Sequence, residues 1–197
     1  MFITFEGTEG CGKSTLIQNL SHQLKTLGIP HLLTREPGGS KVAESIRGVI
    51  LHQEMDPLTE LFLYEAARAE HFKTILLPAL KSKKWVLCDR FTDSTIAYQG
   101  YARGLDLKLI EKLNFIATEG RKPDLTFFLD LPVDIGLKRA SDPNKFEKAG
   151  VAFQKKVRRG FLHSISKSKK RFRVLKIKGK NADEVCALAM KQLEPFI

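Results

Sequence analysis

Short apolar runs alternate along the chain with longer segments in which apolar residues return at helical spacing. The runs predict buried strands at residues 2–6, 31–34, 85–89, 125–130 and 174–177. The segments between them predict helices with apolar faces within residues 16–27, 42–50, 109–117 and 185–193. Ser40 can cap the second of these helices, and Asp56 followed by Pro57 begins another that runs toward Pro78.

This order of elements predicts the fold class. Parallel strands cannot be joined by tight turns and need crossovers, which are usually helices. Strands that are apolar throughout are typical of a parallel sheet covered on both faces. We therefore predict an α/β fold with a five-stranded parallel sheet and helices on both faces. No repeat or linker divides the chain, so residues 1–197 form one predicted domain.

The composition agrees with one globular domain. Of the 197 residues 43% are hydrophobic, which is enough for a core and too many for a disordered chain. No apolar run approaches the ~18 residues of a membrane span, so we expect no membrane association. The three cysteines have no CxxC spacing, and the N-terminus has no signal-peptide pattern. We expect a cytoplasmic protein without disulfide bonds.

The net charge of +11 originates in one region. Residues 138–180 contain 16 lysines and arginines against 2 acidic residues, whereas the rest of the chain has 17 basic and 20 acidic residues. Such a region can bind a nucleic acid or a small polyphosphate, or it can be a solvated face.

A glycine-rich sequence follows the first predicted strand and opens the first predicted helix. It matches G-x-x-x-x-G-K-[ST], the pattern of a phosphate-binding loop (P-loop). The glycines let successive amides point at phosphate oxygens, and the helix dipole adds positive potential. The lysine serves the β- and γ-phosphates, and the serine hydroxyl can bind Mg²⁺. The residues that predict this nucleoside triphosphate site are Gly7, Thr8, Glu9, Gly10, Cys11, Gly12, Lys13, Ser14 and Thr15.

A P-loop protein also needs an acidic residue at the end of a neighbouring strand to hold Mg²⁺. Asp89 and Asp130 both end predicted strands. We favour Asp89, because Arg90 follows it and places a phosphate-binding guanidinium beside a metal-binding carboxylate. Asp130 is expected to cap the helix that follows. The predicted Mg²⁺ ligands are Ser14 and Asp89, the latter directly or through water.

Other features narrow the class of P-loop protein. The Asn-Lys-x-Asp segment with which GTPases read guanine is absent, and a helicase or transporter ATPase would need further domains. Arginines stand instead at separate points, as Arg35, Arg68 and Arg90. Arg68 lies in a mainly apolar helix and Arg90 follows a buried strand, so we expect both to be buried beside an anion.

Further segments resemble bacterial thymidylate kinases. Besides the P-loop they are TREPGG at residues 34–39, YEAAR at 64–68, DRFTDSTIAYQG at 89–100, RKPDLT at 121–126 and GLKRA at 136–140. Each is weak alone, but the order and spacing are specific and cover almost the whole chain. The resemblance implies the P-loop nucleoside monophosphate kinase fold and transfer of the γ-phosphoryl group of ATP to dTMP, in dTTP biosynthesis. It also implies a need for Mg²⁺ and a homodimer.

The resemblance further implies a role for each residue around dTMP. The family often has phenylalanine where this chain has tyrosine against the thymine face, and stacking needs only an aromatic plane. The implied contacts are Tyr64 on the thymine face; Arg68, Thr95 and Ser94 at the base edge; Arg90, helped by Arg35, at the acceptor phosphate; Tyr98 against the sugar C2′; and Glu9 at the 3′-hydroxyl.

Residues 141–150 are expected to form a short lid over the polyphosphate of ATP. Where the family usually carries Asp-Arg-Ile-Glu, this chain has Asn-Lys-Phe-Glu at residues 144–147. We expect Lys145 to supply the lid cation with Arg139 in support, so that the catalytic residues are Lys13, Arg90, Arg139 and Lys145. A solvated Lys145 with Arg139 as the main cation is the alternative. A fall in kcat on replacing Lys145 with alanine would support the first assignment.

Two other functions are considered beside the phosphorylation of dTMP. A kinase for another pyrimidine nucleotide is one, although Arg90 favours a monophosphate acceptor and Tyr98 a deoxyribose. A basic nucleic-acid-binding ATPase is the other, supported by the charges in residues 155–180. No RNP-like, helix-turn-helix or zinc-finger pattern accompanies those charges. We therefore expect dTMP and ATP as binding partners and no nucleic acid.

Overall fold

Five short strands form a parallel sheet at the centre of the computed structural model, which describes residues 1–139 and 145–197. The strand order is β2-β3-β1-β4-β5, and every neighbouring pair is parallel. The predicted α/β fold with a five-stranded parallel sheet is confirmed. The strands are β1 (Phe2–Glu6), β2 (His31–Arg35), β3 (Trp85–Asp89), β4 (Leu125–Asp130) and β5 (Phe172–Lys176).

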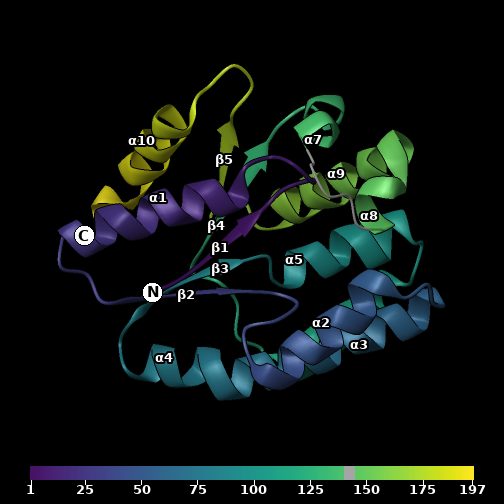
Figure 1. Ribbon diagram of the computed structural model, residues 1–197. Helices are drawn as coiled ribbons and strands as arrows, with labels where there is room; N and C mark the ends of the chain where they lie inside the picture. Colours follow the sequence, from purple (N-terminus) through teal and green to yellow (C-terminus); the bar gives the residue numbers. More distant parts are fainter. Residues whose placement is uncertain (140–144) are drawn as a thin grey trace.

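Helices cover both faces of the sheet (Figure 1). On one face α1 (Lys13–Thr26) packs against α10 (Ala182–Leu193). On the other face α9 (Gly150–Lys167) packs against η2 (Ile96–Ala102), a π-helical segment. The side chains of β4 show this division, because Phe127 belongs to the core beneath α1 and α10 and its neighbour Phe128 to the core beneath α9.

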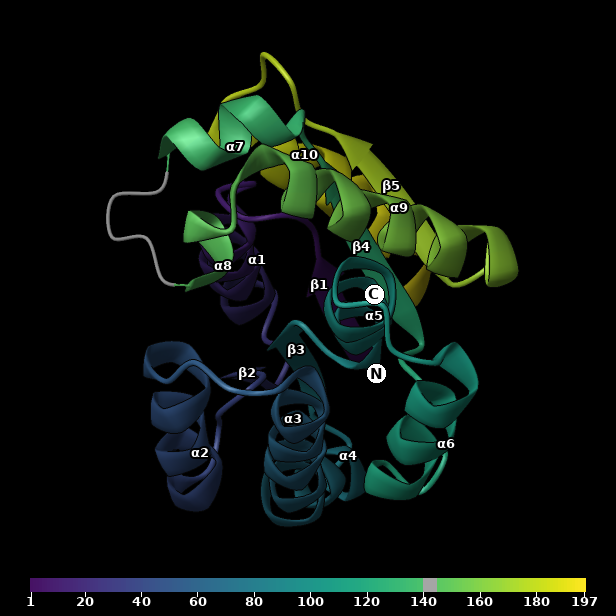
Figure 2. The same cartoon turned by 90° about the vertical axis from the view of Figure 1, so that its right-hand side faces the viewer.

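A second group of helices extends from the β2 side of the sheet (Figure 2). α2 (Lys41–His52) and α6 (Leu107–Ala117) both pack against α3 (Pro57–His71), which lies between them. The shorter elements are η1 (Phe72–Leu76), α4 (Leu77–Lys81), α5 (Thr92–Thr95), α7 (Val133–Arg139), α8 (Lys145–Lys148) and η3 (Glu194–Phe196).

Two boundaries differ from the sequence-based prediction. β5 begins two residues before the predicted 174–177 segment and ends at Lys176. Phe172 is buried in the core, but the arginines on either side made its surroundings look like a loop. The guanidinium of Arg171 is bound to Asp93 at 2.7 Å, which satisfies the charge beside the sheet. The helix that begins at Pro57 also passes through η1 into α4, and Pro78 lies in the first turn of α4, where proline is tolerated.

The basic region is more than a solvated face. α9 buries Val157 and Phe161 in the core and leaves Lys155 and Lys156 exposed, so its charges lie on the outer side of a structural helix. Other cations of this region form ion pairs that join elements of the fold. Arg158 of α9, for example, donates two hydrogen bonds of 2.9 and 3.0 Å to Asp130 at the end of β4.

The sequence led us to expect no membrane-spanning segment and no disulfide bonds. Across residues 1–139 and 145–197, no helix combines the length and the apolar character needed to cross a membrane. The thiols of Cys11, Cys88 and Cys186 are free and buried.

Candidate active site

The P-loop joins β1 to α1 with a backbone that requires glycine. Gly12 is the N-cap of α1 and has a φ of 85°, a left-handed conformation that side chains disfavour. A Cβ on Gly10 would collide with the backbone of α7. The Lys13 side chain is buried in this loop, and its Nζ lies 3.5 Å from the carbonyl oxygen of Gly7 and 3.4 Å from that of Thr8. The ammonium group is thus held where a P-loop receives phosphate oxygens.

Ser14 and Asp89 meet where β1 and β3 end side by side. The Ser14 hydroxyl donates a hydrogen bond of 3.2 Å to Oδ2 of Asp89. Oδ1 of Asp89 is buried and has no hydrogen-bond partner in the described chain. A hydroxyl beside an unpartnered carboxylate oxygen suits Mg²⁺, which prefers oxygen ligands and completes its shell with water and phosphate oxygens. The two residues therefore fit the ion that the P-loop implies.

Asp130, the alternative acid, is placed differently. Both of its carboxylate oxygens accept hydrogen bonds from Arg158 of α9. Its charge therefore joins β4 to α9. Within residues 1–139 and 145–197, no cluster of three or more His, Cys, Asp or Glu side chains could hold a metal without further ligands.

Arg90 connects the P-loop with the elements that follow β3. Its φ of 68° is left-handed, a conformation that costs a non-glycine residue about 1 kcal/mol or more and is often found at functional sites. One terminal nitrogen donates to the Gly7 carbonyl oxygen at 3.1 Å and to Ser94 Oγ at 3.2 Å. The other donates to Glu9 Oε1 at 2.8 Å and to the Tyr98 hydroxyl at 3.1 Å. The Arg90 guanidinium thus contacts both the P-loop and the helical segments that follow β3.

Glu9 is the anion of this group. Its Oε1 accepts a hydrogen bond of 2.6 Å from the Tyr98 hydroxyl as well as the bond from Arg90. Burial alone would raise the pKa of Glu9, but the charges of Arg90 and Lys13 hold it below its ordinary value. The carboxylate is therefore ionised and fixes both the guanidinium and the tyrosine ring.

Glu6, which sequence analysis did not single out, holds two residues close to Arg90 in the chain. Its carboxyl group is fully buried and accepts hydrogen bonds from the amide of Phe91 at 2.9 Å and from Ser94 Oγ at 2.6 Å. Burial and the nearby charge of Asp93 raise the pKa of Glu6 to about 8. Its acidic side chain in an otherwise mainly apolar strand is the sequence signal that could have identified Glu6.

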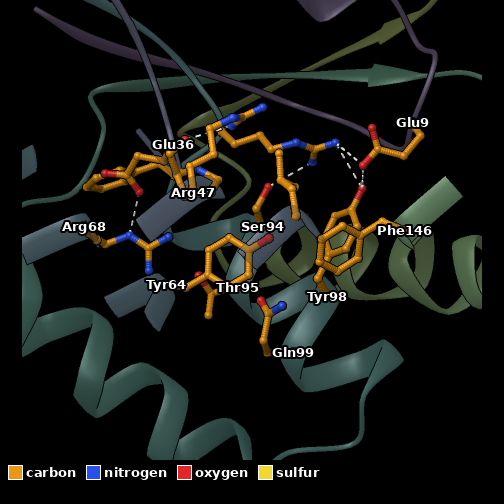
Figure 3. A pocket seen from close by; sticks show the side chains of 14 residues that line it. Glu9, Glu36, Arg47, Tyr64, Arg68, Ser94, Thr95, Tyr98, Gln99 and Phe146 are labelled. Atoms are coloured by element: carbon orange, nitrogen blue, oxygen red, sulfur yellow. Dashed lines mark hydrogen bonds and ion pairs between the residues drawn. The ribbon is translucent and has the colours of Figure 1, made fainter. Parts of the chain in front are cut away.

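A cavity of about 90 Å³ opens beside Arg90. Figure 3 shows side chains from α3, α5 and η2 around it, with the rings of Tyr98 and Phe146 close together at one side. Arg35 does not line this cavity, because its guanidinium is paired with Glu44 at 2.9 Å and is half-exposed. The structure does bring together seven of the predicted substrate-binding residues: Glu9, Tyr64, Arg68, Arg90, Ser94, Thr95 and Tyr98.

Two buried polar side chains line the cavity. Arg68 is buried and donates to Glu36 and Glu65, each at 2.7 Å, and to Asn114 at 2.8 Å. Thr95 is also buried, and its hydroxyl has no hydrogen-bond partner within the described residues. An unpartnered hydroxyl is costly in a protein interior, so this group is suited to a ligand.

Comparison with known proteins agrees with this arrangement. A family model described as "Thymidylate kinase" matches residues 5–187. The chain belongs to the thymidylate kinase family. It is 50% identical over 186 residues to a thymidylate kinase of Geotalea uraniireducens, with coverage of 88% of this chain and 87% of the relative. It is 48% identical over 177 residues to one of Wolbachia pipientis, with coverage of 89% and 86%.

A solved structure extends this agreement to the fold. The crystal structure of a thymidylate kinase from Ehrlichia chaffeensis matches with a TM-score of 0.83 and 38% sequence identity, over 98% of both chains. The fold is therefore that of a P-loop nucleoside monophosphate kinase, as the sequence indicated.

Arg139 and Lys145, the two cations expected to act on the transferred phosphoryl group, lie in different surroundings. Arg139 ends α7 and is exposed. Lys145 begins α8, and its Nζ lies 2.8 Å from Oε2 of Glu60 and donates to the carbonyl oxygen of Gln53 at 3.2 Å. Residues 141–144 of the expected lid lie outside the described residues.

Several residues that line the cavity were not predicted as site residues, and three of them contribute a cation, an amide and an aromatic ring. Arg47 projects from α2 and donates to the Pro37 carbonyl oxygen at 2.8 Å. Gln99 follows Tyr98 in η2, and π-helical turns are frequent at functional sites. Phe146 follows Lys145 in α8. Gln99 lies in the matching segment at residues 89–100 but was given no role, whereas Arg47 lies outside the matching segments and Phe146 in the one that departs from the family pattern.

Proposed function

We propose that this member of the thymidylate kinase family transfers the γ-phosphoryl group of ATP to the 5′-phosphate of dTMP, giving dTDP and ADP. The proposal is carried by the position of Arg90. Its guanidinium contacts the P-loop through Gly7 and the cavity through Ser94 and Tyr98. A cation at this junction can neutralise charge where donor and acceptor phosphates approach.

The donor half of the site binds ATP. The P-loop amides and the N-terminus of α1 receive the phosphates, and Lys13 supplies a positive charge to them. Ser14 and Asp89 are the residues that would hold Mg²⁺, directly or through water. When bound, this ion offsets the negative charge of the polyphosphate.

The acceptor half binds dTMP in the cavity beside Arg90. Tyr64 offers an aromatic plane to the base, and Arg68 with Thr95 and Ser94 faces its polar edge. Tyr98 and Glu9 form the sugar side of the cavity, where the ring crowds C2′ and disfavours a ribonucleotide. Arg35 helps from the rim once its pair with Glu44 opens.

Catalysis in this arrangement needs no general base, because the acceptor oxygen belongs to a phosphate that is already ionised. The residues act by positioning the reactants and by neutralising charge. We assign these tasks to Lys13, to Arg90 and to Arg139 at the exposed end of α7. The ammonium group of Lys145 is instead bound to Glu60.

Steady-state kinetics with four acceptors tests the proposal. ADP release is measured with ATP, Mg²⁺ and dTMP, dUMP, dCMP or thymidine. The highest kcat/KM is expected for dTMP, and thymidine should fail because it offers no phosphate to Arg90. A higher kcat/KM for dCMP or dUMP would identify a kinase for another pyrimidine nucleotide.

We also propose a homodimer, supported by apolar side chains on adjacent helices. α2, α3 and α6 pack side by side (Figure 2), and large apolar patches in water usually mark an interface. The exposed apolar residues on these helices are Val42, Val49, Leu58, Phe62, Phe115 and Ile116. Light scattering after size-exclusion chromatography should give twice the 22.2 kDa chain mass. A monomer at micromolar concentration would contradict the dimer.

We propose a cytoplasmic enzyme whose partners are ATP and dTMP rather than nucleic acid. Cations of the basic region that pair inside the fold support the second point: Arg158 binds Asp130, and Arg171 binds Asp93. Titration with duplex DNA at physiological salt should show no binding tighter than about 1 μM.

A further inference from the structure

Lys145 is anchored to the acceptor half of the site. Its side chain is only 8% exposed, although it comes from the segment expected to form a lid over the polyphosphate of ATP. Nζ lies 2.8 Å from the carboxylate of Glu60 in α3 and 3.2 Å from the carbonyl oxygen of Gln53, which follows α2. The start of α8 is therefore held to two helices of the acceptor side.

Glu60 is built to receive this lysine. Its side chain is fully buried, and a buried carboxylate is very costly unless its oxygens are paired. Gln99 donates to Oε1 at 2.9 Å, and Arg103 donates to the two oxygens at 3.3 and 3.1 Å. Burial alone would raise the pKa of Glu60, but the hydrogen bonds from Lys145, Gln99 and Arg103 hold it below its ordinary value. Lys145 thus completes the shell of an ionised group.

The residue after Lys145 closes the cavity. Phe146 is 3% exposed, lines the cavity and meets the Tyr98 ring edge-on, with the ring centroids 5.5 Å apart (Figure 3). Because the two residues are consecutive in a helix of one turn, the position of the Lys145 backbone decides where the Phe146 ring lies. The guanidinium of Arg103 lies 5.9 Å from the Phe146 ring centroid and also binds Glu60, which ties the two contacts together.

We propose that Lys145 is a positioning residue that, through its ion pair with Glu60, holds Phe146 over the bound acceptor nucleotide. The inference rests on the proposed function, because it assigns dTMP to this cavity. It gives the lid lysine a task different from contact with the γ-phosphoryl group. Lys145 then affects the affinity for dTMP even when ATP is absent, since its partner Glu60 belongs to the acceptor side.

Calorimetric titration with dTMP in the absence of ATP tests this assignment. Lys145→Met keeps the apolar stem but removes the charge, and should weaken dTMP binding about tenfold while kcat stays within about twofold. Lys145→Arg keeps the ion pair and should restore most of the affinity. Lys148→Met is the matched control, because Lys148 lies in the same helix and is exposed. Unchanged dTMP binding by Lys145→Met, or a large loss of kcat with unchanged binding, would overturn the proposal.

A double-mutant cycle separates action through Glu60 from a direct effect of the charge. Glu60→Gln should weaken dTMP binding, and Lys145→Met should add little in that background. Additive losses would contradict a shared mechanism. Thermal unfolding of each variant identifies a misfolded protein, and if Glu60→Gln does not fold, the comparison of Lys145→Met with Lys145→Arg still decides. Wild-type protein that fails to bind dTMP would reject the proposed function itself, whereas normal binding by wild type and Lys145→Met rejects only this inference.

Discussion

The two halves of the active site are built in different ways. The donor half is a continuous loop between β1 and α1. It offers backbone amides and groups such as Oδ1 of Asp89, which has no hydrogen-bond partner in the part of the chain that the structure describes. The acceptor half draws side chains from α2, α3, α5, η2 and α8, and its charged groups are bound to one another, as Arg68 is to Glu36 and Glu65.

This difference reflects what each half must recognise. Phosphates are alike in all nucleotides, so a short loop with fixed amides and a lysine is sufficient. A base and a sugar must be distinguished from close analogues, which requires polar groups held rigidly in a closed cavity. Arg90 lies where the two halves meet. Its left-handed backbone conformation is the strain that accompanies this position.

The largest expected effect comes from the donor half. Lys13→Met should lower kcat by about 10³, because the charge facing the transferred phosphoryl group is lost. Binding of dTMP without ATP should be unchanged, since Lys13 does not line the acceptor cavity. Coupled ADP assays and calorimetry measure the two quantities, and Lys25→Met on the exposed side of α1 is the control. Equal losses of turnover and dTMP binding would show that the halves are not separable.

The next largest effect should come from Asp89, which we propose as a Mg²⁺ ligand of the donor half. Asp89→Asn should lower activity by about 10² at a fixed Mg²⁺ concentration, and added Mg²⁺ should restore part of it. Asp130→Asn is the matched control, because Asp130 binds Arg158 and should affect stability more than Mg²⁺ dependence. Activity as a function of Mg²⁺ concentration, with chelator as the zero point, decides between the two acids. A stronger Mg²⁺ dependence in Asp130→Asn would reverse the assignment.

The sequence predicted the donor half by itself, because a contiguous motif survives folding unchanged. Arg68 and Arg90 were predicted from their positions in apolar segments, but the rest of the acceptor half was predicted only through resemblance, since residues such as Tyr64 and Tyr98 share no local pattern. Even then Arg47 and Phe146 were missed, because neither belongs to one of the matching segments.

The fold followed from the apolar pattern, with limits that have physical causes. The strand at β5 was displaced because Arg171 and Arg173 flank a buried phenylalanine. The buried face of α9 was hidden by its exposed lysines. The Lys145 ion pair was beyond prediction, because Glu60 lies 85 residues earlier in the sequence and only the folded chain brings the two side chains together.

A smaller effect tests the specificity of the acceptor half. Thr95→Val removes a hydroxyl that has no hydrogen-bond partner among residues 1–139 and 145–197, so stability should be unchanged or slightly higher. The KM for dTMP should rise up to about tenfold if that hydroxyl binds the base. Thr126→Val is the control, because the Thr126 hydroxyl is bonded to Thr4 and Arg171 and its loss should destabilise the fold without changing the KM. A KM unchanged in Thr95→Val would remove Thr95 from the base contacts.

The smallest expected effect concerns Glu6, which supports both halves from beneath. The raised pKa of about 8 means that the folded protein keeps Glu6 protonated while the unfolded chain, near 4.5, is ionised. The stability from this group is complete below the unfolded pKa and is lost as the pH rises through 8. Wild type should therefore lose about 2 kcal/mol relative to Glu6→Gln between pH 6 and 8, measured by urea unfolding. Parallel pH profiles for the two proteins would contradict the shifted pKa.

A crystal structure with dTMP and a non-hydrolysable ATP analogue bound tests the division of the site most directly. We expect Arg90 at the acceptor phosphate, Arg139 at the γ-phosphate, and Lys145 still paired with Glu60 while Phe146 covers the nucleotide. A structure in which Lys145 has left Glu60 and contacts the γ-phosphate would contradict it.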